Sequence, residues 1–151
     1  MIPSDDTKGY VAGRERPSHK ELWKKRARAL DLVKDGNWIP SNPEKLKRDF
    51  DELEGTFGIE TATFEDQAEA IINCLREIRP RDYVGNCPPR KSTDLSSAGL
   101  EMFIFKWSSP SLCNAVMYIK FSLIGKGDKG PAYLQSLHPD HPNDPETRLT
   151  P

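Results

Sequence analysis

Residues 115–124, which read AVMYIKFSLI, decide the fold. Apolar and polar side chains alternate along this stretch with a period of two, which is typical of a β-strand with one face against a core. The predicted inner face carries Ala115, Met117, Ile119, Phe121 and Leu123, and the outer face carries Val116, Tyr118, Lys120, Ser122 and Ile124. We expect the inner face to pack on helices. The outer face would then present a phenol, an ammonium group and a hydroxyl in a row.

Two further strands are predicted beside this one. Residues 100–107 are dense in aromatic and β-branched side chains, and residues 132–138 form a shorter third run. The connections are short, so we expect antiparallel pairing, because parallel pairing would need a crossover. Simple alternation in the third strand places Leu134, Ser136 and His138 on one face.

Helical periodicity dominates the N-terminal half. The pattern predicts a first helix over 19–34, with Ser18 and Glu21 as a capping box and Gly36 after its end. A second helix begins at residues 41–44, and a third follows Thr63 and is closed by Pro80. Residues 80–99 are rich in proline, glycine and serine and are interpreted as a long loop.

These elements predict an α+β fold in which three N-terminal helices pack on a short C-terminal antiparallel β-meander. The length of 151 residues suits one domain. We expect a flexible N-terminal tail at 1–17, a single domain at 18–139 and an irregular C-terminal tail at 140–151. No apolar run approaches the roughly 18–20 residues of a membrane span, and the N-terminus does not resemble a secretion signal, so a cytoplasmic protein is expected.

The sequence predicts neither a metal site nor a small-molecule cofactor. Three widely spaced cysteines, Cys74, Cys87 and Cys113, include no CxxC pair, which argues against a zinc site or a disulfide framework. His138, Asp140, His141 and Asp144 are metal-ligand types, but a proline-rich tail offers them no fixed geometry.

Charge is arranged in blocks although the net charge is only -1. Residues 14–28 and 76–91 are mainly basic, whereas residues 49–69 contain acidic side chains and no basic one. This asymmetry indicates either a positive face that meets a polyanion or simply two solvated helix faces.

The outer face of the sheet is the best candidate for catalysis. Lys120 could stabilise charge that develops on a phosphate, and the imidazole of His138 could move protons to or from a ribose 2′-hydroxyl and a leaving oxygen, with no metal required. Tyr118 lies beside them. The alternative is that Tyr, Lys and Ser simply fill the wet face of an antiparallel sheet.

Four short segments in order carry a family resemblance: residues 75–83 (LREIRPRDY), 99–105 (GLEMFIF), 117–121 (MYIKF) and 134–139 (LQSLHP). The stretch from Ala70 to His138 resembles the MqsR family of type II toxin–antitoxin toxins, which are mRNA interferases with a RelE-like fold. The resemblance implies an endoribonuclease that cleaves mRNA, causes growth arrest and is bound by a cognate antitoxin.

Site residues follow from the resemblance and from the predicted sheet. Tyr118, Lys120 and His138 would be catalytic, the last in place of the family's final-strand basic or imidazole group. The RNA-binding residues would be Tyr83, in the same cleft, together with Lys106, Arg90 and Lys91.

Two other functions remain open. The first is a non-catalytic protein-interaction module (an immunity, antitoxin-like or phage regulator) that binds its partner through its helices. The acidic stretch 49–69 and an exposed region around Trp38 motivate it. The second is an RNA- or DNA-binding regulator that uses Lys24, Lys25 and Arg26 of the basic N-terminal helix.

Overall fold

A computed structural model describes residues 17–85, 100–124 and 130–140. Three α-helices and five strands follow the order α1 (His19–Lys34), β1 (Trp38–Pro40), α2 (Pro43–Phe57), α3 (Phe64–Glu77), β2 (Tyr83–Gly85), β3 (Leu100–Ser109), β4 (Ala115–Ile124) and β5 (Ala132–Pro139). Short 3-10 turns, η2 (Pro80–Asp82) and η3 (Pro110–Leu112), precede β2 and β4. Most of the two predicted tails and the residues Arg90 and Lys91 lie outside the described residues.

The predicted sheet is wrong in its number of strands and in having only antiparallel pairs. The strands form one five-stranded mixed sheet in the order β1-β5-β4-β3-β2. β3, β4 and β5 pair antiparallel, but β1 pairs parallel with β5 and lies between α1 and α2 in the chain. β2 adds a second edge strand inside the segment that was interpreted as a loop. Strands are thus interspersed among the helices, and the fold is α+β without a separate C-terminal meander.

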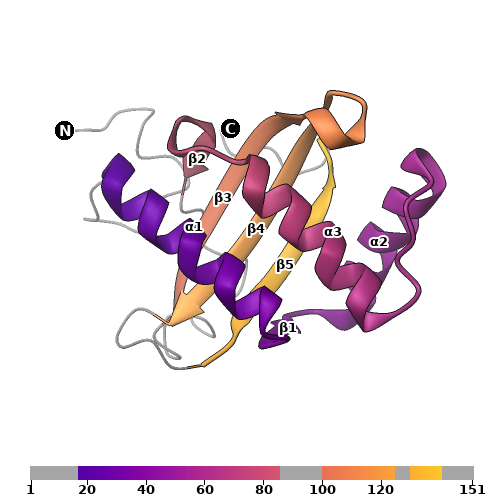
Figure 1. Ribbon diagram of the computed structural model, residues 1–151, viewed down its shortest axis with the longest axis horizontal. Helices are drawn as coiled ribbons and strands as arrows, with labels where there is room; N and C mark the ends of the chain where they lie inside the picture. The colour runs from indigo at the N-terminus through magenta and orange to yellow at the C-terminus, as the bar shows by residue number, and fades with distance from the viewer. Residues whose placement is uncertain (1–16, 86–99, 125–129, 141–151) are drawn as a thin grey trace.

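The helices lie on one face of the sheet, with α1 and α3 side by side and α2 beside β5 (Figure 1). Their apolar side chains form one core with the inner face of the sheet. Phe103, Phe121, Met117 and Ile119 are at most 1% exposed, which places the centre of this core under β3 and β4.

Local signals at the helix ends explain why the predicted helices form. α1 spans the predicted residues, and the Ser18 hydroxyl accepts a hydrogen bond from the Glu21 amide at 3.1 Å. Thr63 and Asp66 form a reciprocal capping box at the start of α3. α2 runs through Gly55 and ends at Gly58, whose φ of 73° is left-handed and suits glycine.

A β-bulge in β5 changes which side chains share a face. Lys120 of β4 pairs with Ser136, but the next residue, Phe121, pairs with Leu134, so Gln135 is an extra residue in the ladder. The predicted grouping of Leu134 with Ser136 and His138 is therefore wrong. Leu134 faces the helices and belongs to the main core, while the other two lie on the opposite face.

Beyond the end of β1, a buried carboxylate covers the outer edge of β5. β1 ends at Pro40, which pairs with Leu134. Three residues further along, the Leu137 amide donates a 3.0 Å hydrogen bond to Asp49 of α2. Burial raises the pKa of Asp49, while the bond from Leu137 and the charge of Lys45 at 3.1 Å oppose that rise. Asp49 therefore joins α2 to the sheet and satisfies an edge amide.

Candidate functional site

The face of the sheet opposite the helices brings the three predicted catalytic side chains together. Cross-strand register aligns Lys106 of β3, Tyr118 of β4 and His138 of β5 in one row. The adjacent row on the same face contains Lys120 and Ser136. Side chains directly opposite each other on neighbouring strands lie about 4.5–5.5 Å apart at Cβ, so these groups are immediate neighbours.

Around the two rows this face is buried and, along β4 and β5, largely polar. Tyr118 is 0% exposed, His138 2% and Lys120 7%, so none of them presents a wet surface in this structure. The remaining buried polar side chains here are Ser122, Gln135 and Ser136. Toward β2, Met102 and Ile104 pack with Tyr118 as a small separate apolar cluster. Burying an ammonium, an imidazole and a phenol costs free energy unless each finds partners, so polar residues are an expensive way to fill a sheet face.

Contacts within the row fix the orientation of the imidazole. The rings of Tyr118 and His138 stack, with centroids 5.2 Å apart and planes 19° apart. Nδ1 of His138 donates to the carbonyl oxygen of Pro139 at 2.6 Å, because a carbonyl can only accept. In the neutral ring Nε2 then carries the lone pair that can take up a proton. At the other end of the row, Nζ of Lys106 lies 3.2 Å from a carboxylate oxygen of Asp140.

Tyr83 does not join this group. It pairs with Phe105 in the register of β2 and β3, and the two rings meet edge to face at 5.7 Å within the main core. Its ring is therefore on the helix-covered face, opposite Tyr118, and is only 3% exposed. The expected shared cleft between Tyr83 and the catalytic residues is not present in this arrangement.

The expected exposure around Trp38 is also wrong for the indole itself. Trp38 is 4% exposed and stacks on Phe64 with ring centroids 4.7 Å apart. Phe64 itself is 45% exposed, and Trp23, which is 42% exposed, lies elsewhere, near the start of α1. Alternation cannot distinguish these cases, since Trp38 lies in a strand of only three residues.

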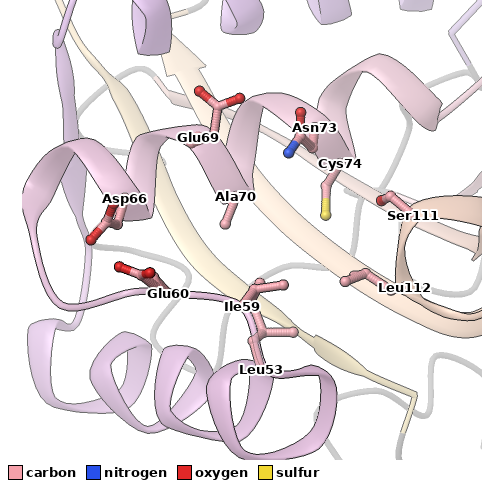
Figure 2. A pocket seen from close by; sticks show the side chains of 10 residues that line it. All are labelled: Leu53, Ile59, Glu60, Asp66, Glu69, Ala70, Asn73, Cys74, Ser111 and Leu112. Atoms are coloured by element: carbon pink, nitrogen blue, oxygen red, sulfur yellow. The ribbon is translucent and has the colours of Figure 1, made fainter.

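A cavity of about 310 Å³ opens on the helix side, between the end of α2, α3 and η3. In Figure 2, Ala70 and Cys74 point from α3 toward Leu53, Ile59 and Leu112, which make the apolar part of the wall. Carboxylates from the predicted acidic stretch also line it: Glu60, Asp66 and Glu69. The cavity therefore suits an apolar group that carries a positive charge.

Cys74 in that wall is a packing residue rather than a nucleophile. It is 2% exposed, and burial together with the negative charge of Glu77 raises the pKa of its thiol. Cys113 is exposed, and Cys87 lies outside the described residues. Among the described residues, no three His, Cys, Asp or Glu side chains converge as a metal site would require.

Glu77 organises the end of the molecule where α3 meets the β3–β4 connection, and no sequence motif indicates this role. Its Oε1 accepts from Trp107 Nε1 at 2.9 Å and from the Ser109 hydroxyl at 2.5 Å, and Oε2 accepts from the Ser111 amide at 3.2 Å. Burial by itself raises the pKa of Glu77, but these hydrogen bonds outweigh it and lower the pKa below its ordinary value.

This lowered pKa has a consequence for stability as a function of pH. A carboxylate with a depressed folded-state pKa stabilises the fold above its unfolded pKa, and that contribution is lost as pH falls through the folded value. Glu77→Gln is expected to lower the free energy of unfolding at pH 7 by about 1–2 kcal/mol, because the amide cannot satisfy all three donors as a charged acceptor does. Below about pH 4 the difference from the parent should shrink.

Urea unfolding of Glu77→Gln across pH 3–8 measures this effect. Glu69→Gln, on an exposed position of the same helix, is the matched control and should track the parent. A constant difference between Glu77→Gln and the parent over the whole range would contradict the role assigned to the charge.

In the part of the chain that the structure describes, every helix is too short or too polar to cross a membrane. No family model matches the chain, and comparisons with curated proteins and with solved structures return no match.

Proposed function

We propose that this protein is an endoribonuclease that cleaves mRNA, the toxin component of a type II toxin–antitoxin system, similar in kind to the MqsR family. The observation that supports the proposal is the pair of adjacent rows on the sheet face opposite the helices, where a phenol, an imidazole and two lysines lie in neighbouring register positions. Proteins tolerate such groups in a buried cluster where they serve chemistry or fold specificity.

The two rows together contain the groups that RNA cleavage by transesterification needs. Nε2 of His138 takes the proton of a ribose 2′-hydroxyl, and the 2′-oxygen forms a bond to the adjacent phosphorus. The bond from phosphorus to the 5′-oxygen breaks, and that oxygen receives a proton from the Tyr118 phenol or from water. The Lys120 ammonium stabilises the negative charge on the phosphoryl oxygens as the bond forms. The products are a 2′,3′-cyclic phosphate and a 5′-hydroxyl, with no redox change.

The small exposed fractions of these side chains place a condition on that chemistry. At 0–7% exposure they cannot contact a polymer directly, so the substrate reaches them only when this face is more open than in this structure. The Nδ1 bond to Pro139 and the stacked Tyr118 ring hold the imidazole in place meanwhile.

Induced expression in a host cell tests the proposal. The parent is expected to stop translation and growth, and the double variant Lys120→Ala/His138→Ala is expected to relieve the arrest at equal protein level. Lys47→Ala, at an exposed lysine of α2, should remain toxic. Unimpaired growth with abundant parent protein would count against a toxin.

The acid-lined cavity favours a second candidate, a non-catalytic module that binds a protein partner through its helices. A lysine or arginine side chain of the partner could place its stem on the apolar wall and its charge near Glu60 and Asp66. This candidate is favoured if one stoichiometric partner binds the purified protein, if Glu60→Lys weakens that binding, and if RNA is not cleaved.

A further inference from the structure

Five residues from two distant parts of the chain form an exposed aromatic and basic surface. We call Trp23, Arg26, Arg76, Arg79 and Arg81 the Trp23–arginine surface. Trp23 lies near the start of α1, and the arginines other than Arg26 lie at or just after the end of α3, the neighbouring helix in Figure 1. The indole is 42% exposed, and the guanidinium carbons of Arg26 and Arg79 lie 5.0 and 5.9 Å from its ring centroid.

Two of the arginines form a fixed support for the indole. Arg26 donates to the carbonyl oxygens of Leu75 and Arg76 at 2.7 and 2.8 Å. Arg79 donates from Nη1 to the carbonyl oxygens of Arg76, Glu77 and Ile78 at 3.0–3.1 Å. These bonds satisfy the carbonyl end of α3 and offset its negative dipole. These hydrogen bonds also fix the side-chain conformations of both arginines beside Trp23.

The other two guanidinium groups are directed to a neighbouring depression. Arg76 and Arg81 are exposed, and with Arg79 they line a depression of about 410 Å³ beside Trp107. Its two carboxylates are already engaged as acceptors: Glu77 binds Trp107, Ser109 and Ser111, and Asp82 accepts from the Arg79 amide at 2.8 Å. The four guanidinium groups carry more positive charge than these two carboxylates carry negative charge, so the surface is positive overall.

The depression lies between Arg79, whose guanidinium group is beside the indole, and the candidate catalytic face. Ser108 of β3 lines it and is exposed. Ser108 is two residues from Lys106 on the same face of β3, and two residues of a strand span about 6.8 Å. Lys106 is the register partner of Tyr118. A chain that begins on Trp23 and passes Arg79 into the depression therefore arrives next to the row.

We propose that the Trp23–arginine surface binds the single-stranded RNA substrate, with one base stacked on Trp23 and phosphates held by Arg76 and Arg81. An exposed ring flanked by cations is the combination that single strands recognise, because bases supply π-faces and the backbone supplies evenly spaced negative charge. An acidic peptide would use the cations but not the ring. The inference rests on the proposed function for its choice of RNA as the polymer.

Fluorescence anisotropy with a labelled 2′-O-methyl oligonucleotide tests binding apart from cleavage, since its blocked 2′-oxygen cannot attack phosphorus. Trp23→Ala is expected to weaken binding by about fivefold or more, from the usual contribution of base–aromatic stacking. Arg76→Ala/Arg81→Ala is expected to reduce the slope of log affinity against log salt by about 1.4, from two lost contacts at about 0.7 each. Arg48→Ala, an exposed arginine of α2, is the matched control and should change neither quantity.

Heparin, a polyanion without bases, separates stacking from charge. Its binding should fall in the double arginine variant and be unchanged in Trp23→Ala. The assignment is overturned if Trp23→Ala leaves the affinity for the oligonucleotide unchanged, as it is expected to leave that for heparin. It is overturned too if the oligonucleotide binds both variants as tightly as it binds the parent. A third result would also overturn it: the variants bind a poly-glutamate peptide more weakly than the parent does, but bind the oligonucleotide with the parent's affinity.

The two proposals fail in different ways. Cleavage of ordinary RNA with KM unchanged in the surface variants would overturn this inference and leave the nuclease intact. Surface-dependent binding of the oligonucleotide with no cleavage by the parent would overturn the nuclease and leave the RNA-binding surface.

Discussion

His138→Asn is expected to slow RNA cleavage by the purified protein by about 10²–10⁴-fold, the usual contribution of a positioned general acid or base. The asparagine amide can still donate to the Pro139 carbonyl in place of Nδ1, but it cannot take up a proton as Nε2 does. The measurement is the single-turnover rate on a labelled single-stranded RNA, with the 2′,3′-cyclic phosphate product identified by mass.

A buried residue needs a control for general damage to the fold. Ser122→Ala removes another buried polar group from the same sheet face, where it accepts from Gln135 at 2.8 Å, and should keep the parent rate. Both variants should remain folded in urea titrations, with losses of about 1 kcal/mol each, the usual contribution of one hydrogen bond. A His138→Asn protein that is folded and cleaves at the parent rate would exclude the imidazole from the reaction.

Deletion of Gln135 is expected to keep both faces of β5, because it removes the extra residue and leaves Ser136 opposite Lys120 and Leu134 opposite Phe121. Ala132 and Leu134 then stay in the core. The expected cost is about 1–3 kcal/mol, from the lost hydrogen bond to Ser122 and from the adjustment of β5 against β1. Urea unfolding followed by circular dichroism, with expression level as a first indicator, measures the loss.

Gln135→Ala is the matched control because it keeps the number of residues in β5. It removes only the hydrogen bond to Ser122 and should cost about 1 kcal/mol. A loss above about 4 kcal/mol in the deletion variant would contradict this expectation, because it would require the two faces of β5 to exchange.

The comparison of Leu134 with Leu123 shows how far alternation predicts the sheet. In β4 the period of two holds from Ala115 to Leu123, and the predicted inner face is the face that packs on the helices. In β5 the alternation of faces is interrupted at Gln135. The bulge depends on the pairing with β4, and no residue type in the sequence indicates it. The helices were predicted more accurately, since Ser18, Gly58 and Thr63 act on amides and carbonyls a few residues away.

The edge strands and the burial of the candidate site depend on distant partners. Residues 38–40 and 83–85 are too short to show a period, and their strands form only by pairing with β5 and β3. Alternation placed Tyr118 and Lys120 on one face correctly, but it cannot report how much of that face is covered. Glu77 binds residues at least 30 positions away, so only the folded chain shows its role.

The bond between Asp49 and the Leu137 amide also limits how this molecule can associate. An unpaired strand edge invites a strand from a second molecule, which leads to swapped dimers or fibrils. Here β1, whose Pro40 has no N–H to offer, occupies one part of that edge, and α2 with its carboxylate occupies the next. A neighbouring chain therefore finds no open hydrogen-bond ladder to extend along β5, and contacts on this side of the protein must be made by side chains.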